Sequence, residues 1–167
     1  MITCLIPPIL FANHNDFSEA RLEKKDYIIE LLLYISKNVE KINSVVFSEC
    51  EKLIVEVAAE NEYYASSDDG KMLFSKEKKT LICYPSASGD IEIPDEVEII
   101  GENAFESCLN LINVKIPNSV LIIEGGAFEE CSSLTTLTIP QNVSKIGTFA
   151  FNKCTGLKSI TFEDTET

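Results

Sequence analysis

The chain has 167 residues, a length that fits one domain better than two. Hydrophobic residues make up 45% of the chain and charged residues 25%, as in soluble globular proteins, which excludes a wholly disordered chain. Its 14 Lys and Arg against 27 Asp and Glu give a formal net charge of −13, and so acidic a surface repels nucleic-acid phosphates. No apolar run reaches the ~18 residues of a membrane span, so we expect no transmembrane segment.

The N-terminal residues are apolar but lack the pattern of a cleaved signal peptide. No Lys or Arg precedes the short apolar stretch Ile2–Ala12, and Pro7 and Pro8 interrupt it. We therefore expect that this stretch is retained rather than cleaved.

The segment that follows carries a helix signal and then a strand signal. Asp16 and Glu19 have the spacing of an N-cap residue and its capping-box partner, which predicts a helix over about Phe17–Lys25 or further. One longer helix through Ser36 is the alternative. We prefer a strand over Leu33–Ile35, because its last residue is in register with the repeats described below.

Residues 61–88 break that register and indicate a β-hairpin. Ser67–Gly70 is a turn signal. Further along, two apolar segments, Met72–Phe74 and Thr80–Tyr84, flank the polar stretch Lys76–Lys79. Such a pattern predicts two antiparallel strands joined across the polar stretch.

From residue 91 onward the sequence repeats with a period of 23 residues. Each unit reads Leu-x-x-Val-x-Ile-Pro-x-x-Val-x-x-Ile-x-x-x-Ala-Phe-x-x-Cys, with conservative replacements. Positions that recur at this step include Ala104-Phe105, Ala127-Phe128 and Ala150-Phe151; Cys108, Cys131 and Cys154; Val114, Leu137 and Ile160; and Ile93-Pro94, Ile116-Pro117 and Ile139-Pro140. A fixed period of this length is the signature of a stacked repeat architecture.

The unit has a direct physical interpretation. Val-x-Ile alternates with period two, so its apolar side chains share one face of a short strand, and the proline that follows ends the strand. The Ala-Phe segment is expected to form a short helical or 3₁₀ piece on the opposite side. One unit alone cannot bury its apolar side chains, but stacked units bury them against one another. We expect a ladder of buried phenylalanines in chain order, formed by Phe47, Phe105, Phe128 and Phe151.

The same spacing extends upstream in a less regular form. Six apolar or cysteine positions keep it: Ile35, Val39, Ile42, Phe47, Cys50 and Leu53. Ser36 stands where the regular units have proline, and Val46 stands where they have alanine.

This pattern resembles the BspA-like leucine-rich repeats, also called the Treponema pallidum type. The resemblance implies a repeat solenoid, α/β or mostly β, as a right-handed array of about five 23-residue units with a β-hairpin insertion. We expect irregular N-terminal repeats with a short helix over residues 1–60, the hairpin insertion over 61–88, and three regular repeats over 89–167.

The six cysteines predict a structural role. Cys50, Cys108, Cys131 and Cys154 occupy one repeat position, and neither the close Cys pairs nor the Cys/His spacing of a zinc site is present. We expect reduced thiols buried in a ladder, no metal site and no cofactor. Cys4 and Cys83 fall outside the ladder.

The sequence also lacks the residues of the common catalytic sites. His14 is the only histidine, so a Ser-His-Asp or Cys-His arrangement is not evident. Gly125-Gly126 lacks the lysine of a phosphate-binding loop, and Asp68-Asp69-Gly70 is too short for a calcium loop. Acidic residues such as Glu129 and Glu130 are expected to lie on turns, as part of a solvent-exposed surface. We expect that the chain is not an enzyme.

The candidate site is the outward face of the predicted strands, on the concave side of the solenoid. Alternation with the buried residues turns six polar side chains outward: Asn113, Lys115, Thr136, Thr138, Ser159 and Thr161. By the same register Asp90, Glu92 and Tyr34 join them. Solenoids commonly bind partners on this surface. An ordinary solvated sheet face, with threonine present for its strand propensity, is the alternative.

We therefore predict a non-catalytic protein-interaction module with a protein partner. The family resemblance favours a surface or adhesion protein that binds host or matrix proteins, and it places the chain at the cell surface. The alternative is an intracellular scaffold or regulator, which the poor signal-peptide pattern favours and which would be cytoplasmic.

Overall fold

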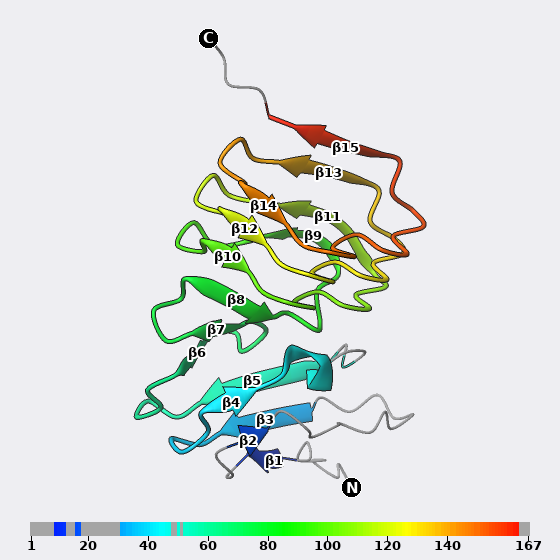
Figure 1. Ribbon diagram of the computed structural model, residues 1–167. Coiled ribbons are helices and arrows are strands. Elements are labelled where there is room, and N and C mark those ends of the chain that lie inside the picture. The colour runs from blue at the N-terminus through cyan, green and yellow to red at the C-terminus, as the bar shows by residue number, and fades with distance from the viewer. Residues whose placement is uncertain (1–8, 13–15, 18–30, 48–49, 51, 164–167) are drawn as a thin grey trace, which may run out of the picture.

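The computed structural model describes residues 9–12, 16–17, 31–47, 50 and 52–163. These residues form a β-solenoid of about five turns, as the repeat predicts, with almost no helix (Figure 1). β1 lies at one end of the stack and β15 at the other, so sequence order and order along the axis coincide. The predicted fold class is confirmed.

The longer strands of successive turns pair in parallel. They are β1 (Ile9–Ala12), β3 (Leu31–Ile35), β5 (Leu53–Val57), β9 (Gly89–Glu92), β11 (Leu111–Lys115), β13 (Thr136–Ile139) and β15 (Ser159–Phe162). They form three sheets, β1-β3-β5, β9-β11 and β13-β15. The strands β9, β11 and β13 each end at or just before an Ile-Pro pair, whose proline has no N–H to continue the strand pairing.

Shorter strands form a second set around the same axis. Five of them have two residues each: β2 (Asp16–Phe17), β4 (Lys41–Ile42), β10 (Ile99–Ile100), β12 (Ile122–Ile123) and β14 (Lys145–Ile146). The strands β14, β12, β10 and β8 (Thr80–Cys83) follow one another in one sheet, which β7 (Leu73–Ser75) and β6 (Tyr64–Ser66) extend.

The Ala-Phe segments of the regular units are consecutive turns, so the prediction of a short helix there is wrong. Asn103 and Ser107 have φ values of 55° and 59°, which interrupt any helix around Ala104-Phe105. In addition, the N–H of Phe105 donates to the carbonyl of Ala127 on the next turn (2.8 Å), so it is not available to an α-helix. Within the described residues the one 3₁₀ helix, η1 (Ser44–Phe47), lies in the irregular upstream unit.

The N-terminal predictions have mixed outcomes. The strand expected over Leu33–Ile35 is confirmed as β3, which begins two residues earlier and pairs with β1 and β5. The longer helix through Ser36 is therefore wrong for residues 31–35. Of the helix expected over Phe17–Lys25, the first residue lies in β2, and the rest falls outside the described residues. Among the described residues no helix has the length and apolar character to cross a membrane.

The predicted hairpin is confirmed as β7 and β8, which pair antiparallel across the polar stretch Lys76–Lys79. The sequence did not predict β6, which adds a third antiparallel strand. It also did not predict that β8 pairs in parallel with β10, with Leu81 beside Ile100. The hairpin is therefore continuous with the sheet of short strands.

This hairpin separates two hydrophobic cores. Leu73 lies beside Cys83 in the strand pairing, and both side chains belong to the N-terminal cluster around Phe47. Phe74 lies beside Leu81, and both belong to the large cluster that fills the regular repeats. Both faces of the hairpin are thus buried.

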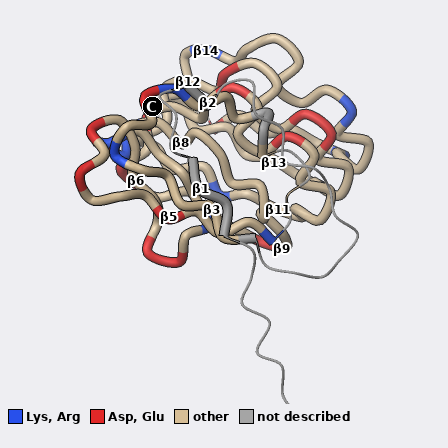
Figure 2. The backbone as a smooth tube through the Cα atoms, turned by 90° about the horizontal axis from the view of Figure 1, so that it is seen from below, with Lys and Arg blue, Asp and Glu red and all other residues tan. Residues whose placement is uncertain are grey.

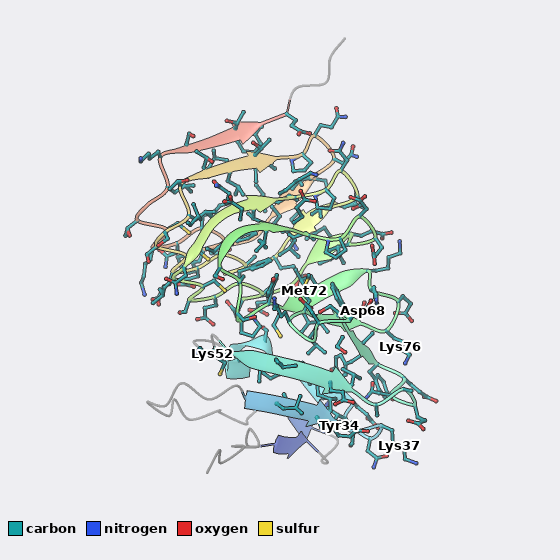
Figure 3. The ribbon with its side chains drawn as sticks, turned by 180° about the vertical axis from the view of Figure 1, so that it is seen from behind. Tyr34, Lys37, Lys52, Asp68, Met72 and Lys76 are labelled. Carbon is teal, nitrogen blue, oxygen red and sulfur yellow. The ribbon has the colours of Figure 1, made fainter. Side chains whose placement is uncertain are left out.

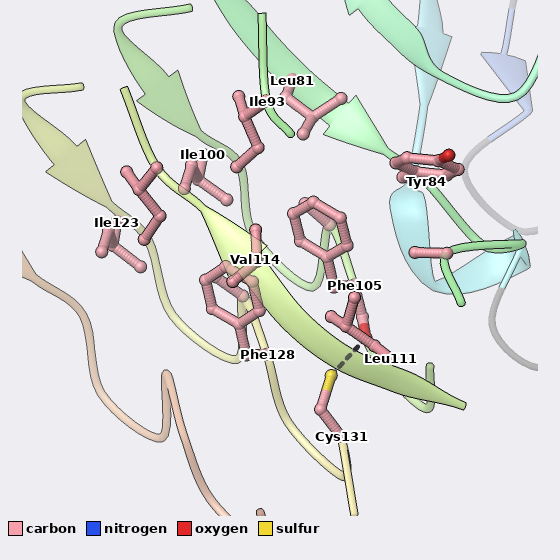
Figure 4. Packing of buried hydrophobic residues seen from close by; sticks show 14 of the residues in the cluster. Leu81, Tyr84, Ile93, Ile100, Phe105, Leu111, Val114, Ile123, Phe128 and Cys131 are labelled. Atoms are coloured by element: carbon pink, nitrogen blue, oxygen red, sulfur yellow. Dashed lines mark hydrogen bonds between the residues drawn. The ribbon is translucent and has the colours of Figure 1, made fainter. Parts of the chain in front are cut away.

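The phenylalanine ladder is present in the regular units but does not include Phe47. Phe105 and Phe128 stack with ring centroids 4.8 Å apart, and Phe128 and Phe151 follow at 5.6 Å. Tyr84, not Phe47, lies beside Phe105, at 5.9 Å (Figure 4). The reason is the hairpin, which places Phe47 in the other cluster.

Replacing Phe128 with alanine is expected to lower the free energy of unfolding by about 3–5 kcal/mol, because this ring is fully buried between two other rings. Urea unfolding of the purified chain measures the change. Phe149→Ala is the matched control, since that ring is 66% exposed and its loss should cost less than about 0.5 kcal/mol. Equal losses in the two variants would contradict the ladder.

Candidate protein-binding face

The strand β13 alternates between buried and exposed side chains as the sequence predicts, whereas all four side chains of β15 are exposed. On β13, Leu137 and Ile139 are buried, and Thr136 and Thr138 are exposed. We call the outward side chains of β9, β11, β13 and β15 the strand face. Its members are Asp90, Glu92, Asn113, Lys115, Thr136, Thr138, Ser159 and Thr161.

Hydrogen bonds link the strand face from one turn to the next. The Asn113 side chain donates from Nδ2 to Oδ1 of Asp90 (2.7 Å) and accepts at Oδ1 from the hydroxyl of Thr136 (3.2 Å). It also accepts from the hydroxyl of Thr135 (3.3 Å). These contacts fix the orientation of the amide, because its oxygen and its nitrogen have different partners.

Charge is confined to one end of the strand face. Lys115 lies beside Glu92, with Nζ and Oε1 3.3 Å apart, and the other carboxylate here is Asp90. Both partners of that ion pair are largely exposed, so it adds little to stability. Beyond Asn113, the strand-face residues on β13 and β15 carry only hydroxyl groups. The face therefore changes from an acidic end to a neutral, hydroxyl-bearing end.

Tyr34 does not join this face. It lies on β3, with Phe11 and Glu56 as its neighbours in the strand pairing, in a sheet separate from β9-β11. Figure 3 shows Tyr34 in the N-terminal part of the stack, and the chain between β5 and β9 contains the hairpin. The structure thus groups eight of the nine outward residues expected from the sequence.

The turns opposite the strands hold a second, charged series. Glu130 accepts a hydrogen bond from the Ser107 hydroxyl (3.2 Å) and forms an ion pair with Lys153. These three residues are 23 positions apart. The hydrogen bond from the Lys153 ammonium holds the pKa of the Glu130 carboxyl below its usual value. Glu129 accepts from Asn152 (2.7 Å). Acidic and basic residues lie mainly on the loops around the stack (Figure 2).

Three of the four repeat cysteines, Cys108, Cys131 and Cys154, form the buried ladder that the sequence predicts. Cys50 is half-buried and packs against the N-terminal cluster instead. The thiol of Cys131 donates to the carbonyl of Phe105 (3.1 Å), and that of Cys154 donates to the carbonyl of Phe128 (2.9 Å). Each thiol thus bonds to the preceding turn.

Cys83, which lies outside the repeat position of the other cysteines, is buried in the N-terminal cluster. Burial raises the pKa of its thiol. Contact with the sulfur of Cys154 and burial together raise the pKa of Cys131. Cys4 and His14 fall outside the described residues. In the described part of the chain no three His, Cys, Asp or Glu side chains are grouped to hold a metal ion.

Two small hollows lie away from the strand face. One, of about 280 Å³, is lined by Lys37, Asn38, Glu40, Glu60, Glu62 and Tyr63. The other, of about 110 Å³, lies near the hairpin and is lined by Lys52, Pro85, Ser86, Ala87, Ser88, Cys108, Leu109 and Asn110. Lys37 and Lys52 lie at opposite ends of the strands in Figure 3. The sequence predicted neither hollow, because each includes residues from the irregular upstream unit or the inserted segment.

The parallel strands, the Ile-Pro turns and the 23-residue ladders define a leucine-rich-repeat solenoid. Residues 82–167, about half of the chain, match the family described as the BspA type leucine rich repeat region, in 6 copies. The chain belongs to this family.

Solved structures show the same fold. A leucine-rich repeat protein from Eubacterium ventriosum is 29% identical with a TM-score of 0.71, and the match covers 81% of this chain and 37% of that one. The pneumococcal vaccine antigen PcpA is 24% identical with a TM-score of 0.62, over 93% of this chain and 50% of that one. This chain therefore spans half or less of the length of both. No curated protein matches it.

Because burial raises the pKa of Cys83, we expect the free energy of unfolding to fall as the pH rises above about 8.5, the pKa of an exposed thiol. Above that pH the unfolded chain loses the proton while the folded chain keeps it, which favours unfolding by about 1.4 kcal/mol per pH unit for each such thiol. Urea unfolding between pH 7 and pH 9.5 measures the slope. Cys83→Ala should make the slope shallower, and an unchanged slope would contradict the assignment.

Proposed function

We propose that this chain is a non-catalytic protein-interaction module whose strand face binds an extended segment of a partner protein. The observation that carries the proposal is the turn-to-turn array of short polar groups on four neighbouring strands, over a core that holds those strands rigid. The residues proposed to contact the partner are Asn113, Lys115, Thr136, Thr138, Ser159 and Thr161.

The chemistry of the face indicates what the segment should carry. The hydroxyls of Thr138, Ser159 and Thr161 can donate to backbone carbonyl or carboxylate oxygens of a strand laid across them. At the other end, Asp90 and Glu92 favour an N–H group or a positive charge. A partner segment with acceptors at one end and a cation at the other would match this gradient.

The family resemblance supports a role at a cell surface, where the partner would be a host or matrix protein. A second candidate is an intracellular scaffold or regulator that uses the same face. The observation that favours the second is the set of free cysteines, since thiols persist in reducing compartments. Brief protease treatment of intact cells separates the two, because only a surface protein is digested.

Thr138→Arg is expected to weaken partner binding about tenfold or more, because it adds bulk and charge to an exposed position at the centre of the face. Partners are first captured from extracellular-matrix proteins and from cell lysate, and affinity is then measured by titration. The melting temperature should not change.

Glu129→Gln is the matched control for that experiment. Its amide oxygen can still accept from Asn152, so the fold is preserved while a charge is removed from the opposite turns. Capture that is lost in Glu129→Gln and retained in Thr138→Arg would place the function on the turns and overturn the proposal.

A further inference from the structure

The smaller of the two hollows lies where the stack of long strands is interrupted. Three of the residues that line it come directly before long strands: Lys52 before β5, Ser88 before β9 and Asn110 before β11. Figure 3 shows Lys52 at the start of β5. The sheets β1-β3-β5 and β9-β11 are separate, so strand pairing does not hold the turn before β5 against the turn before β9. A hollow of about 110 Å³ remains among these turns.

Part of the wall of this hollow is apolar and includes an exposed leucine. Pro85 and Ala87 are buried there, and Leu109 is 44% exposed. In the two following turns the position of Leu109 is occupied by Ser132 and Thr155. Described turns lie on both sides of Leu109, so its exposure is a property of this unit. The hollow thus has an apolar side chain at a position where the later units have hydroxyl groups.

The hollow also has a positive charge and a hydroxyl group without a partner. Lys52 is the one charged residue in the described lining, and no ion pair among the described residues includes it. The hydroxyl of Ser86 is buried and has no hydrogen-bond partner in the described part of the chain. Of the acidic residues nearby in sequence, Asp90 accepts from Asn113 on the strand face, and Glu51 falls outside the described residues. Because a buried hydroxyl without a partner is unfavourable, the lining favours a negatively charged acceptor.

We propose that this hollow binds the C-terminal residue of a partner protein, at a site separate from the strand face. The apolar side chain of that residue lies against Leu109 and Pro85. Its carboxylate accepts hydrogen bonds from the ammonium group of Lys52 and the hydroxyl of Ser86, which gives Ser86 the partner that it lacks. Capture of a terminal carboxylate is an established mode of peptide recognition.

The size of the hollow favours a chain end over an internal segment. A volume of about 110 Å³ is roughly that of four water molecules in the liquid, which is room for part of one residue and not for two. In an extended internal segment neighbouring side chains point to opposite sides, and residues i and i+2 are about 6.6 Å apart. An apolar side chain and an acidic side chain of such a segment therefore cannot enter together. A C-terminal residue carries both groups on one Cα atom.

A capped amino acid tests the site in the full chain. N-acetylvaline has the apolar side chain and the free carboxylate, and N-acetylvalinamide differs only in lacking the charge. Titration of the isotope-labelled chain is followed by the amide signals in NMR spectra. N-acetylvaline should shift the signals of Ser86, Ser88 and Asn110, and the amide should bind about tenfold or more weakly. Absence of shifts at these residues, or equal binding of the two probes, would overturn the proposal.

Two pairs of variants separate the charge from the apolar contact. Lys52→Gln should weaken the binding of N-acetylvaline about tenfold, whereas Lys145→Gln removes the same charge from an exposed position on β14 and should leave it unchanged.

Leu109→Ser should weaken binding about fivefold, since it removes the apolar contact. Leu121→Ser is its matched control, because Leu121 is also 44% exposed and also has a serine at its position in the next unit, Ser144. Both leucine variants should keep the melting temperature of the native chain. Equal loss of binding in the two leucine variants, or in the two lysine variants, would contradict the proposed site.

Discussion

Each turn of this protein depends on its neighbour for hydrogen-bond partners and for cover of its apolar side chains. The N–H of Phe105 reaches Ala127, and that of Phe128 reaches Ala150, at the same distance of 2.8 Å. The thiol of Cys131 likewise bonds to the carbonyl of Phe105. Because these bonds run between turns, a single unit cannot satisfy its own hydrogen-bonding groups. The 23-residue spacing places each group beside its partner on the neighbouring turn.

The same dependence between turns explains which positions differ from one unit of this chain to the next. Inward positions must fit a ring or branched side chain from the next turn, so they repeat as Val, Leu and Ile. Outward positions meet solvent and vary freely from Asn113 to Thr136 to Ser159. The side chains of the strand face therefore differ from unit to unit, over inward positions that repeat.

Sequence periodicity was sufficient to predict the strands in the regular part of the fold. Alternation within each unit predicted β11, β13 and β15 and the exposure of Thr136 and Thr138, because strand geometry leaves only two faces. Periodicity gave a wrong prediction for the Ala-Phe segments, because their N–H groups donate to carbonyls of the neighbouring turn and not within a helix. A local pattern that suits a tight helical turn does not reveal a bond to a residue 22 positions away.

Periodicity also could not predict features that occur once. Buried Asn61 donates to the carbonyls of Ser36 and Val39 and accepts from the N–H groups of Tyr63 and Tyr64. It thereby anchors the start of the inserted segment to the upstream unit. Nothing in the sequence around a single asparagine marks it as the residue with four partners.

The hairpin that separates the two cores has a consequence for how the molecule opens. Side chains on its two faces belong to different clusters, with Leu73 and Cys83 on one side and Phe74 and Leu81 on the other. Outside the hairpin, the hydroxyl of Ser44 in the upstream unit donates to the carbonyl of Glu102 in the regular repeats. Amide hydrogen exchange should therefore resolve two protected groups of residues with separate opening free energies, divided at the hairpin, in a chain whose repeats otherwise suggest one continuous cooperative stack.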